Sequence, residues 1–284
     1  MGTGEESRMN SPIWASRPIF NGVRHLLDVL EDGMTVSLIA TFDDLKTCSV
    51  SDQVSEVLHR PDLQEFDYIP VTENDSVVGV LIRDNALDVM DSVQSVMCQL
   101  HESTLISADA SLLSFVAEVD KTPYCLVLQR RSIKGIVTLS DLQKLAVRPV
   151  LFSLITCVEL LLAEWLRQKY PNEQDWLSKL SEERRKKVEE NYERYSQQDM
   201  AIDRMTTTEF CDKRDAALKL GAFSTGKNAR KNQLEEIQKL RDSIAHAGDY
   251  ALTAEKAKWV AQTVRSALEI IELLEESLRV ETAS

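Results

Sequence analysis

Apolar residues recur along this chain with two different periods, which divide it into two parts. Up to about residue 150, short apolar runs alternate with polar turns and short amphipathic stretches, a pattern typical of small α/β units. From Leu151 onward, apolar positions recur every three to four residues, which predicts helices throughout. We therefore expect an α+β chain with a mixed domain over residues 18–149 and an all-helical domain over residues 150–284. Residues 1–17 show neither period, which indicates a flexible tail.

The first part should open with a helix from Arg17 to Leu30 that Gly33 stops. A strand is expected from Val36 to Ala40, and a helix from Val50 to Leu58. The pair Arg148-Pro149 should end the last helix of this part, because proline disfavours helical geometry in the residue before it. Beyond it the expected helices are Phe152–Tyr170, a charged helix capped by Ser181, Glu209–Leu220 closed by Gly221, a helix leading to residue 248, and Thr253–Val280.

An internal repeat dominates the first part. Residues 68–85 align with residues 124–141 at a constant offset of 56, and Tyr68 and Tyr124 fall in register, as do Gly79 and Gly135. Each copy is a strand, a polar turn, a second strand and a helix, with a further helical segment upstream. The repeats should span about residues 34–91 and 92–149 and form a pseudo-symmetric pair packed sheet to sheet.

Polar residues follow the second strand of the second copy. Thr138 offers a hydroxyl at a helix N-terminus, where phosphate is favoured, and Asp141 can accept bonds from both ribose hydroxyls. Gly135 would let a ligand approach the backbone. Thr138 and Asp141 also have the spacing of a capping box, and both roles can hold together. The first copy has Ile82 and Asn85 at these positions, so we expect one competent cleft.

The repeat resembles a CBS-domain pair, and the sequence Gly-Ile-Val-Thr-Leu-Ser-Asp at 135–141 carries the resemblance. It implies two β-α-β-β-α units that bind an adenosine nucleotide (ATP, ADP or AMP) as a regulatory ligand. Carried over to this chain, the resemblance places the ligand at Tyr124, Gly135, Thr138 and Asp141.

A second group of polar residues lies near the end of the fourth helix of the helical part. Leu234, Ile237, Leu240 and Ile244 form one buried stripe, and Gly248 is a residue type that ends helices. This leaves Arg241, Asp242 and His246 for chemistry. Arginine suits phosphate oxygens, and histidine suits proton transfer, so together they suit attack of a ribose 2′-hydroxyl on the adjacent phosphate. Residues five apart are separated by roughly 140° on a helix, so convergence needs a frayed end or a second protomer.

The spacing alone is weak support, since chance places an Arg five residues before a His in about one quarter of chains of this composition. On spacing alone, the favoured interpretation is a His246 that interacts with the helix dipole and a surface Arg241.

The sequence Leu-Arg-Asp-Ser-Ile-Ala-His at 240–246 resembles the signature of the HEPN superfamily, whose members carry Arg, a polar residue, three further residues and His. The resemblance spans about residues 151–284. It implies an all-helical bundle and a homodimer in which two copies of the motif meet in one cleft that cuts RNA.

The composition restricts the partners, metals and cellular location that we expect. The net charge of −13 argues against indiscriminate coating of nucleic acid, and residues 1–150 carry most of it, with 12 Lys and Arg against 22 Asp and Glu. A basic patch of Lys227, Arg230, Lys231, Lys239 and Arg241 leads into the motif. Five scattered cysteines and four histidines show no metal-ligand spacing, so we expect no metal and a reduced, cytoplasmic protein. The apolar run from Leu151 to Leu166 is expected to be too short for a membrane.

Two hypotheses follow. The leading one is a cytoplasmic homodimer whose CBS pair senses an adenosine nucleotide and controls a metal-independent endoribonuclease. Its catalytic residues would be Arg241, Asp242 and His246. The rival is a non-catalytic nucleotide-sensing adaptor whose helical part binds a protein or nucleic-acid partner.

Overall fold

The computed structural model describes residues 19–198, 202–246 and 249–282. The predicted tail, residues 1–17, and the predicted helix stop, Gly248, lie outside these residues. Two compact units make up the chain. Of the described residues, those within 29–152 and 239–265 form what we call the repeat unit, and those within 19–28, 153–238 and 266–282 form the helical unit. The segment 239–265, which contains the Arg241–His246 motif, thus groups with the repeats.

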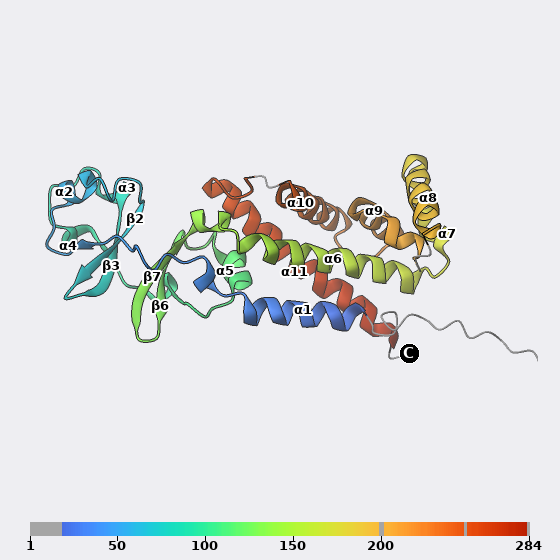
Figure 1. Cartoon of the computed structure of the whole chain (residues 1–284), viewed down its shortest axis with the longest axis horizontal. Helices are drawn as coiled ribbons and strands as arrows, with labels where there is room; N and C mark the ends of the chain where they lie inside the picture. The colour runs from blue at the N-terminus through green and yellow to red at the C-terminus, as the bar shows by residue number, and fades with distance from the viewer. Residues whose placement is uncertain (1–18, 199–201, 247–248, 283–284) are drawn as a thin grey trace, which may run out of the picture. The chain divides into compact units, whose positions relative to one another are not determined.

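The repeat unit contains two small mixed sheets with the strand orders β1-β2-β3-β4 and β5-β6-β7 (Figure 1). Its elements up to residue 143 are η2 (Val36–Leu38), β1 (Cys48–Ser49), α2 (Val54–His59), β2 (Tyr68–Glu73), β3 (Ser76–Ile82), α3 (Arg83–Ala86), α4 (Val93–Val96), β4 (Cys98–Gln99), η3 (Glu102–Thr104), β5 (Leu105–Ser107), α5 (Leu112–Glu118), β6 (Tyr124–Gln129), β7 (Ser132–Thr138) and η4 (Leu139–Gln143).

The register of the two hairpins confirms the repeat. Tyr68 pairs with Ile82 in β2 and β3, and Tyr124 pairs with Thr138 in β6 and β7, again at an offset of 56. An irregularity follows Val71 in the first hairpin and Val127 in the second, at corresponding positions. Residues of both hairpins share one core cluster, so the sheets pack on each other as expected: Val80, Tyr124, Leu126 and Ile136, with Tyr68, Ile82 and others against them.

The predicted strand from Val36 to Ala40 is wrong, because these residues include the 3-10 helix η2. Val36 and Ile39 are both fully buried, a spacing of three that suits a tight helix. The neighbouring Thr35 and Thr41 form isolated bridges to Ser111 and Ile136 in the second repeat. A short apolar run is ambiguous between strand and helix, and these long-range pairings decide it.

The other elements of the described residues are helices. They are α1 (Ile19–Gly33), α6 (Val147–Lys169), α7 (Glu173–Leu177), α8 (Glu182–Ser196), η5 (Arg204–Thr207), α9 (Phe210–Leu220), α10 (Lys227–Ala245) and α11 (Ala254–Thr282) (Figure 1). The predicted caps at Ser181 and Gly221 are confirmed. The Ser181 hydroxyl accepts from the Arg184 amide at 3.3 Å, and Gly221 ends α9 with a φ of 84°, in the left-handed region.

Pro149 does not end a helix, contrary to the prediction, since α6 starts at Val147 and runs through it. Pro149 falls in the first turn, where the missing N–H has no intrahelical partner and the ring meets no preceding turn. At 23 residues, α6 is also long and apolar enough to span a bilayer, so the expectation that this segment is too short is wrong. Of its most apolar window 61% is buried in the protein, as in a core helix.

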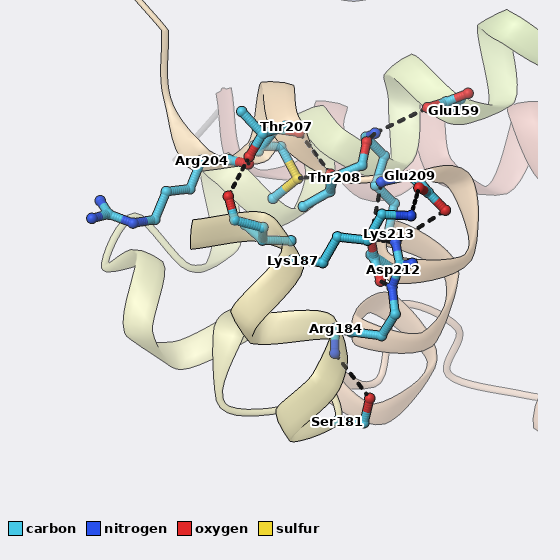
Figure 2. A network of polar contacts seen from close by, with 12 residues as sticks. Glu159, Ser181, Arg184, Lys187, Arg204, Thr207, Thr208, Glu209, Asp212 and Lys213 are labelled. Carbon is cyan, nitrogen blue, oxygen red and sulfur yellow. Dashed lines mark hydrogen bonds and ion pairs between the residues drawn. The ribbon is translucent and has the colours of Figure 1, made fainter. Parts of the chain in front are cut away.

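Figure 2 shows a polar network that joins α6, α8, η5 and α9 within the helical unit. Asp212, only 2% exposed, accepts from Nε and Nη2 of Arg184 at 2.7 and 2.6 Å. Buried Lys213 donates to the Glu159 carboxylate at 2.9 Å and to the Thr208 carbonyl at 2.8 Å. Because buried charges are tolerated only when paired, this network fixes how α9 packs on its neighbours.

A further ion pair makes the helical unit sensitive to acid. Burial raises the pKa of Asp203, but hydrogen bonds and charge from Arg167 and Thr206 lower it more, to about 2. The folded pKa lies below the ordinary value near 4, so the stabilisation is present above about pH 4 and is lost as pH falls towards 2. We expect urea midpoints to fall over this range less in Asp203→Asn than in wild type. Equal losses in the two proteins would contradict this assignment.

Candidate functional site

A cleft of about 470 Å³ opens in the repeat unit beside the end of β7. Four segments form its walls, and all of them belong to this unit. Three are the stretch before β1, the stretch leading into β2, and the β7–η4 junction. The fourth is residues 251–254, at the start of α11. The lining residues used below are Thr41, Asp44, Lys46, Glu65, Phe66, Asp67, Tyr68, Thr138, Asp141, Leu252 and Thr253.

Thr138 and Asp141 both line the cleft, at the junction of β7 and η4. The Asp141 Oδ2 accepts from the Thr138 amide at 2.6 Å, as a capping box predicts, and also from the Thr138 hydroxyl at 3.1 Å. Because this hydroxyl donates its proton to Asp141, it faces a ligand as an acceptor. It cannot at the same time donate to a phosphate.

Lys144 occupies the other carboxylate oxygen of Asp141. Its ammonium lies 2.7 Å from Asp141 Oδ1 and also donates to the Ile39 carbonyl. A carboxylate has about four lone-pair positions, and three of those on Asp141 are in use. The remaining position suits one ribose hydroxyl, whereas the sequence predicted that Asp141 would accept from both ribose hydroxyls.

Gly135 serves close packing of the chain on itself. A Cβ there would lie 2.7 Å from the Thr41 carbonyl oxygen and 2.8 Å from Phe42 Cδ1, so the segment before β1 is what approaches this backbone. Gly79 has the same role in the first repeat, where a Cβ would lie 2.5 Å from the Cys98 carbonyl oxygen. Gly135 therefore makes room for the segment before β1, and not for a ligand as the sequence predicted.

Tyr124 lies in the core between the sheets and is 6% exposed. Its ring centroid is 4.7 Å from that of Tyr68, and it is Tyr68 that lines the cleft. The sequence pattern aligned the two tyrosines without deciding which one a ligand meets. Of the predicted ligand residues, only Thr138 and Asp141 line the cleft; the sequence did not point to its other walls, which include Tyr68, Phe66 and residues 251–254.

The cleft wall is acidic. It carries the carboxylates of Asp44, Glu65, Asp67 and Asp141 against the ammonium of Lys46, which itself lies 2.7 Å from Asp44. Carboxylates repel phosphate oxygens, so the wall favours the nucleoside end of a nucleotide, with the phosphates towards solvent.

Arg241 and Asp242 lie in the last turns of α10, and His246 follows the helix end at Ala245. Asp242 and His246 are exposed and Arg241 is partly exposed. The Arg241 guanidinium lies 3.7 Å from the Asp242 carboxylate. The His246 amide donates to the Asp242 carbonyl at 3.1 Å, so helical bonding continues through His246. Arg241 and His246 therefore remain roughly 140° apart around the axis and do not converge within one chain.

The segment after the motif is anchored to η4. The Tyr250 hydroxyl donates to the Leu142 carbonyl at 2.7 Å, and burial raises the pKa of Tyr250 to about 12, so the proton stays in place. The Gln143 amide oxygen, in the orientation that satisfies its bonds, accepts from the amides of Ala251 at 2.7 Å and Leu252 at 3.1 Å. Residues 250–252 are thus fixed beside the cleft.

Solved CBS-domain structures match part of the chain. The CBS domain of a bacterial CNNM/CorC family Mg²⁺ transporter in complex with ATP is 19% identical, covers 44% of this chain and 94% of that chain, and has a TM-score of 0.34. A CBS-containing hemolysin-like protein of Oenococcus oeni PSU is 13% identical over 42% of this chain and 94% of that chain, with a TM-score of 0.34. The CBS domains of a Streptococcus pneumoniae transcriptional regulator are 19% identical over 37% and 92%, with a TM-score of 0.32.

No protein-family model matches the chain, and no curated protein matches it. Within the described residues, no group of three or more His, Cys, Asp or Glu side chains is placed to hold a metal ion.

Proposed function

We propose that this protein is a nucleotide-regulated, metal-independent endoribonuclease that acts as a homodimer. The cleft at the end of β7 carries the proposal, since it contains both Thr138 and Asp141, the pair that the repeat marks for a nucleotide. An adenosine nucleotide is the expected regulatory ligand. Asp141 would accept from a ribose hydroxyl through its remaining lone pair, and Tyr68 and Phe66 offer apolar contact to a base.

The Arg241–His246 motif supplies the proposed chemistry. His246 would act as general acid and base, and Arg241 would stabilise the charge of the phosphorane. Asp242, 3.7 Å from Arg241, would hold that guanidinium in place. Because Arg241 and His246 diverge within one chain, a complete site needs the histidine of one protomer and the arginine of another. This geometric requirement supports the homodimer.

Cleavage of an RNA pool by the purified full chain tests the proposal. We expect cleavage in EDTA, products with 2′,3′-cyclic phosphate ends, and a rate that changes when AMP, ADP or ATP is added. A chain that binds a nucleotide and leaves every RNA intact would instead be the adaptor, and the search would move to its protein or nucleic-acid partner.

Asp141→Asn tests the nucleotide cleft separately from catalysis. Asparagine keeps the shape and can still accept from the Thr138 amide, but it loses the charge. Hydrogen bonds to charged groups contribute about 1.5–3 kcal/mol, so the Kd for AMP or ATP should rise roughly 10- to 100-fold in calorimetry. Asp109→Asn, an exposed aspartate of the same repeat, is the control and should leave the Kd unchanged. An unchanged Kd in Asp141→Asn would remove Asp141 from the ligand site.

A further inference from the structure

One wall of the cleft comes from outside the two repeats. Ala251, Leu252, Thr253 and Ala254 line it, although more than 100 residues separate them from Asp141. They directly precede and begin α11, and His246 lies only four residues before Tyr250. We infer that the nucleotide contacts this fourth wall, so that occupancy of the cleft controls the conformation of the chain at His246. The inference rests on the proposed function and adds its mode of regulation.

The short helix η4 links the ligand contact to this wall. Asp141 faces the cleft from η4, and the next two residues hold the wall segment. The Leu142 carbonyl accepts from the Tyr250 hydroxyl, and the Gln143 side chain accepts from the amides that follow Tyr250. A ligand that bonds to Asp141 therefore acts on the same five-residue helix that anchors residues 250–252.

A second connection reaches the motif from its other side. Arg148 donates from Nη1 to the Ile244 carbonyl at 3.3 Å, and its guanidinium carbon lies 5.2 Å from the centroid of the Tyr250 ring. Arg148 thus holds the end of α10 and the wall segment together. Arg148 contacts Ile244 and Tyr250, and His246 lies between these two residues in the sequence.

Leu252 is the wall residue best placed to sense a ligand. Its side chain is 62% exposed, while its own amide and that of Ala251 donate to the Gln143 side chain. Apolar surface left open at a cleft gains free energy when a base or ribose covers it. A nucleotide that covers Leu252 would stabilise the docked segment, and by linkage the docked segment would strengthen nucleotide binding by the same factor.

Two substitutions test separately the contact between nucleotide and Leu252 and the coupling of the cleft to His246. Calorimetry with ATP and AMP on the full chain measures the contact. Leu252→Ala removes the proposed contact and should raise the Kd about threefold or more. Leu145→Ala is the matched control, because Leu145 is 81% exposed in the same unit and does not line the cleft. Tyr250→Phe removes the bond to Leu142 but keeps the ring, and Tyr195→Phe controls for loss of an exposed hydroxyl.

Hydrogen exchange with mass spectrometry measures the coupling without relying on activity. ATP should slow exchange in peptides covering residues 241–246 and 249–257 of wild type. In Tyr250→Phe the slowing over 241–246 should fall about two- to tenfold, the factor that one hydrogen bond supplies.

The outcomes are distinct. Binding of ATP with unchanged exchange over 241–246, or an unaltered Kd in Leu252→Ala, would overturn the inference and leave the nucleotide cleft standing. Failure of every nucleotide to bind would overturn both the inference and nucleotide regulation. Ligand-dependent exchange in a chain that never cuts RNA would support the inference and remove only the ribonuclease activity.

Discussion

His246→Ala is expected to lower the rate of RNA cleavage by roughly 10²- to 10⁴-fold, the usual contribution of a positioned general acid or base. The side chain is exposed, so its removal should leave the fold and the thermal midpoint intact. Cleavage of a fluorescent RNA, with product ends identified by mass spectrometry, measures the effect. His25→Ala, an exposed histidine on α1, is the control and should cleave at the wild-type rate.

Mixing two inactive variants tests whether the site is shared between protomers. If Arg241 of one chain works with His246 of the other, a mixed dimer of Arg241→Ala and His246→Ala contains one intact site. Random exchange of subunits should then restore about a quarter of wild-type activity, since half of the dimers are mixed. No recovery would place both groups of a site in one chain. If His246→Ala is fully active, His246 is not catalytic, and the interpretation that it interacts with the helix dipole is favoured.

Arg184→Ala is expected to reduce the free energy of unfolding by about 3–5 kcal/mol, because it leaves the buried Asp212 charge without its partner. Both nitrogens that Arg184 directs at Asp212 lie within 2.7 Å of a carboxylate oxygen, and the Asp212 side chain is 2% exposed. Urea unfolding followed by circular dichroism measures the loss. Arg185→Ala removes the adjacent, exposed arginine of the same helix and should change stability by less than about 0.5 kcal/mol.

A double substitution shows whether the cost comes from the unpaired charge. Arg184→Met with Asp212→Leu replaces the pair by apolar side chains of similar size and should recover most of the lost stability. If Arg184→Ala and Arg185→Ala lose equal stability, the network in Figure 2 does not hold α9 in place.

Local patterns in the sequence predicted the repeat, the helices and their caps. The 56-residue offset predicted that the two hairpins correspond residue by residue, and their observed registers agree with it because register depends on the alternation of side chains within a few residues. Ser181, Gly221 and the Thr138–Asp141 capping box were also predictable, since each acts on backbone groups no more than four residues away. The predictions of a strand at Val36–Ala40 and of a helix end at Pro149 were wrong because local patterns do not decide these features. Short apolar runs fit either element, and the effect of a proline depends on where the helix begins.

By itself, the sequence predicted which residues would carry chemistry: Thr138 and Asp141 in the repeat, and Arg241, Asp242 and His246 near the end of α10. Only the tertiary structure decided what surrounds them. It placed Tyr68 rather than Tyr124 on the cleft wall, packed Gly135 against Thr41, and brought Leu252 into the lining of the cleft that also contains Asp141. Contacts between residues that are far apart in the sequence leave no period or spacing in the chain. They result from how whole elements pack, and packing depends on all buried side chains together.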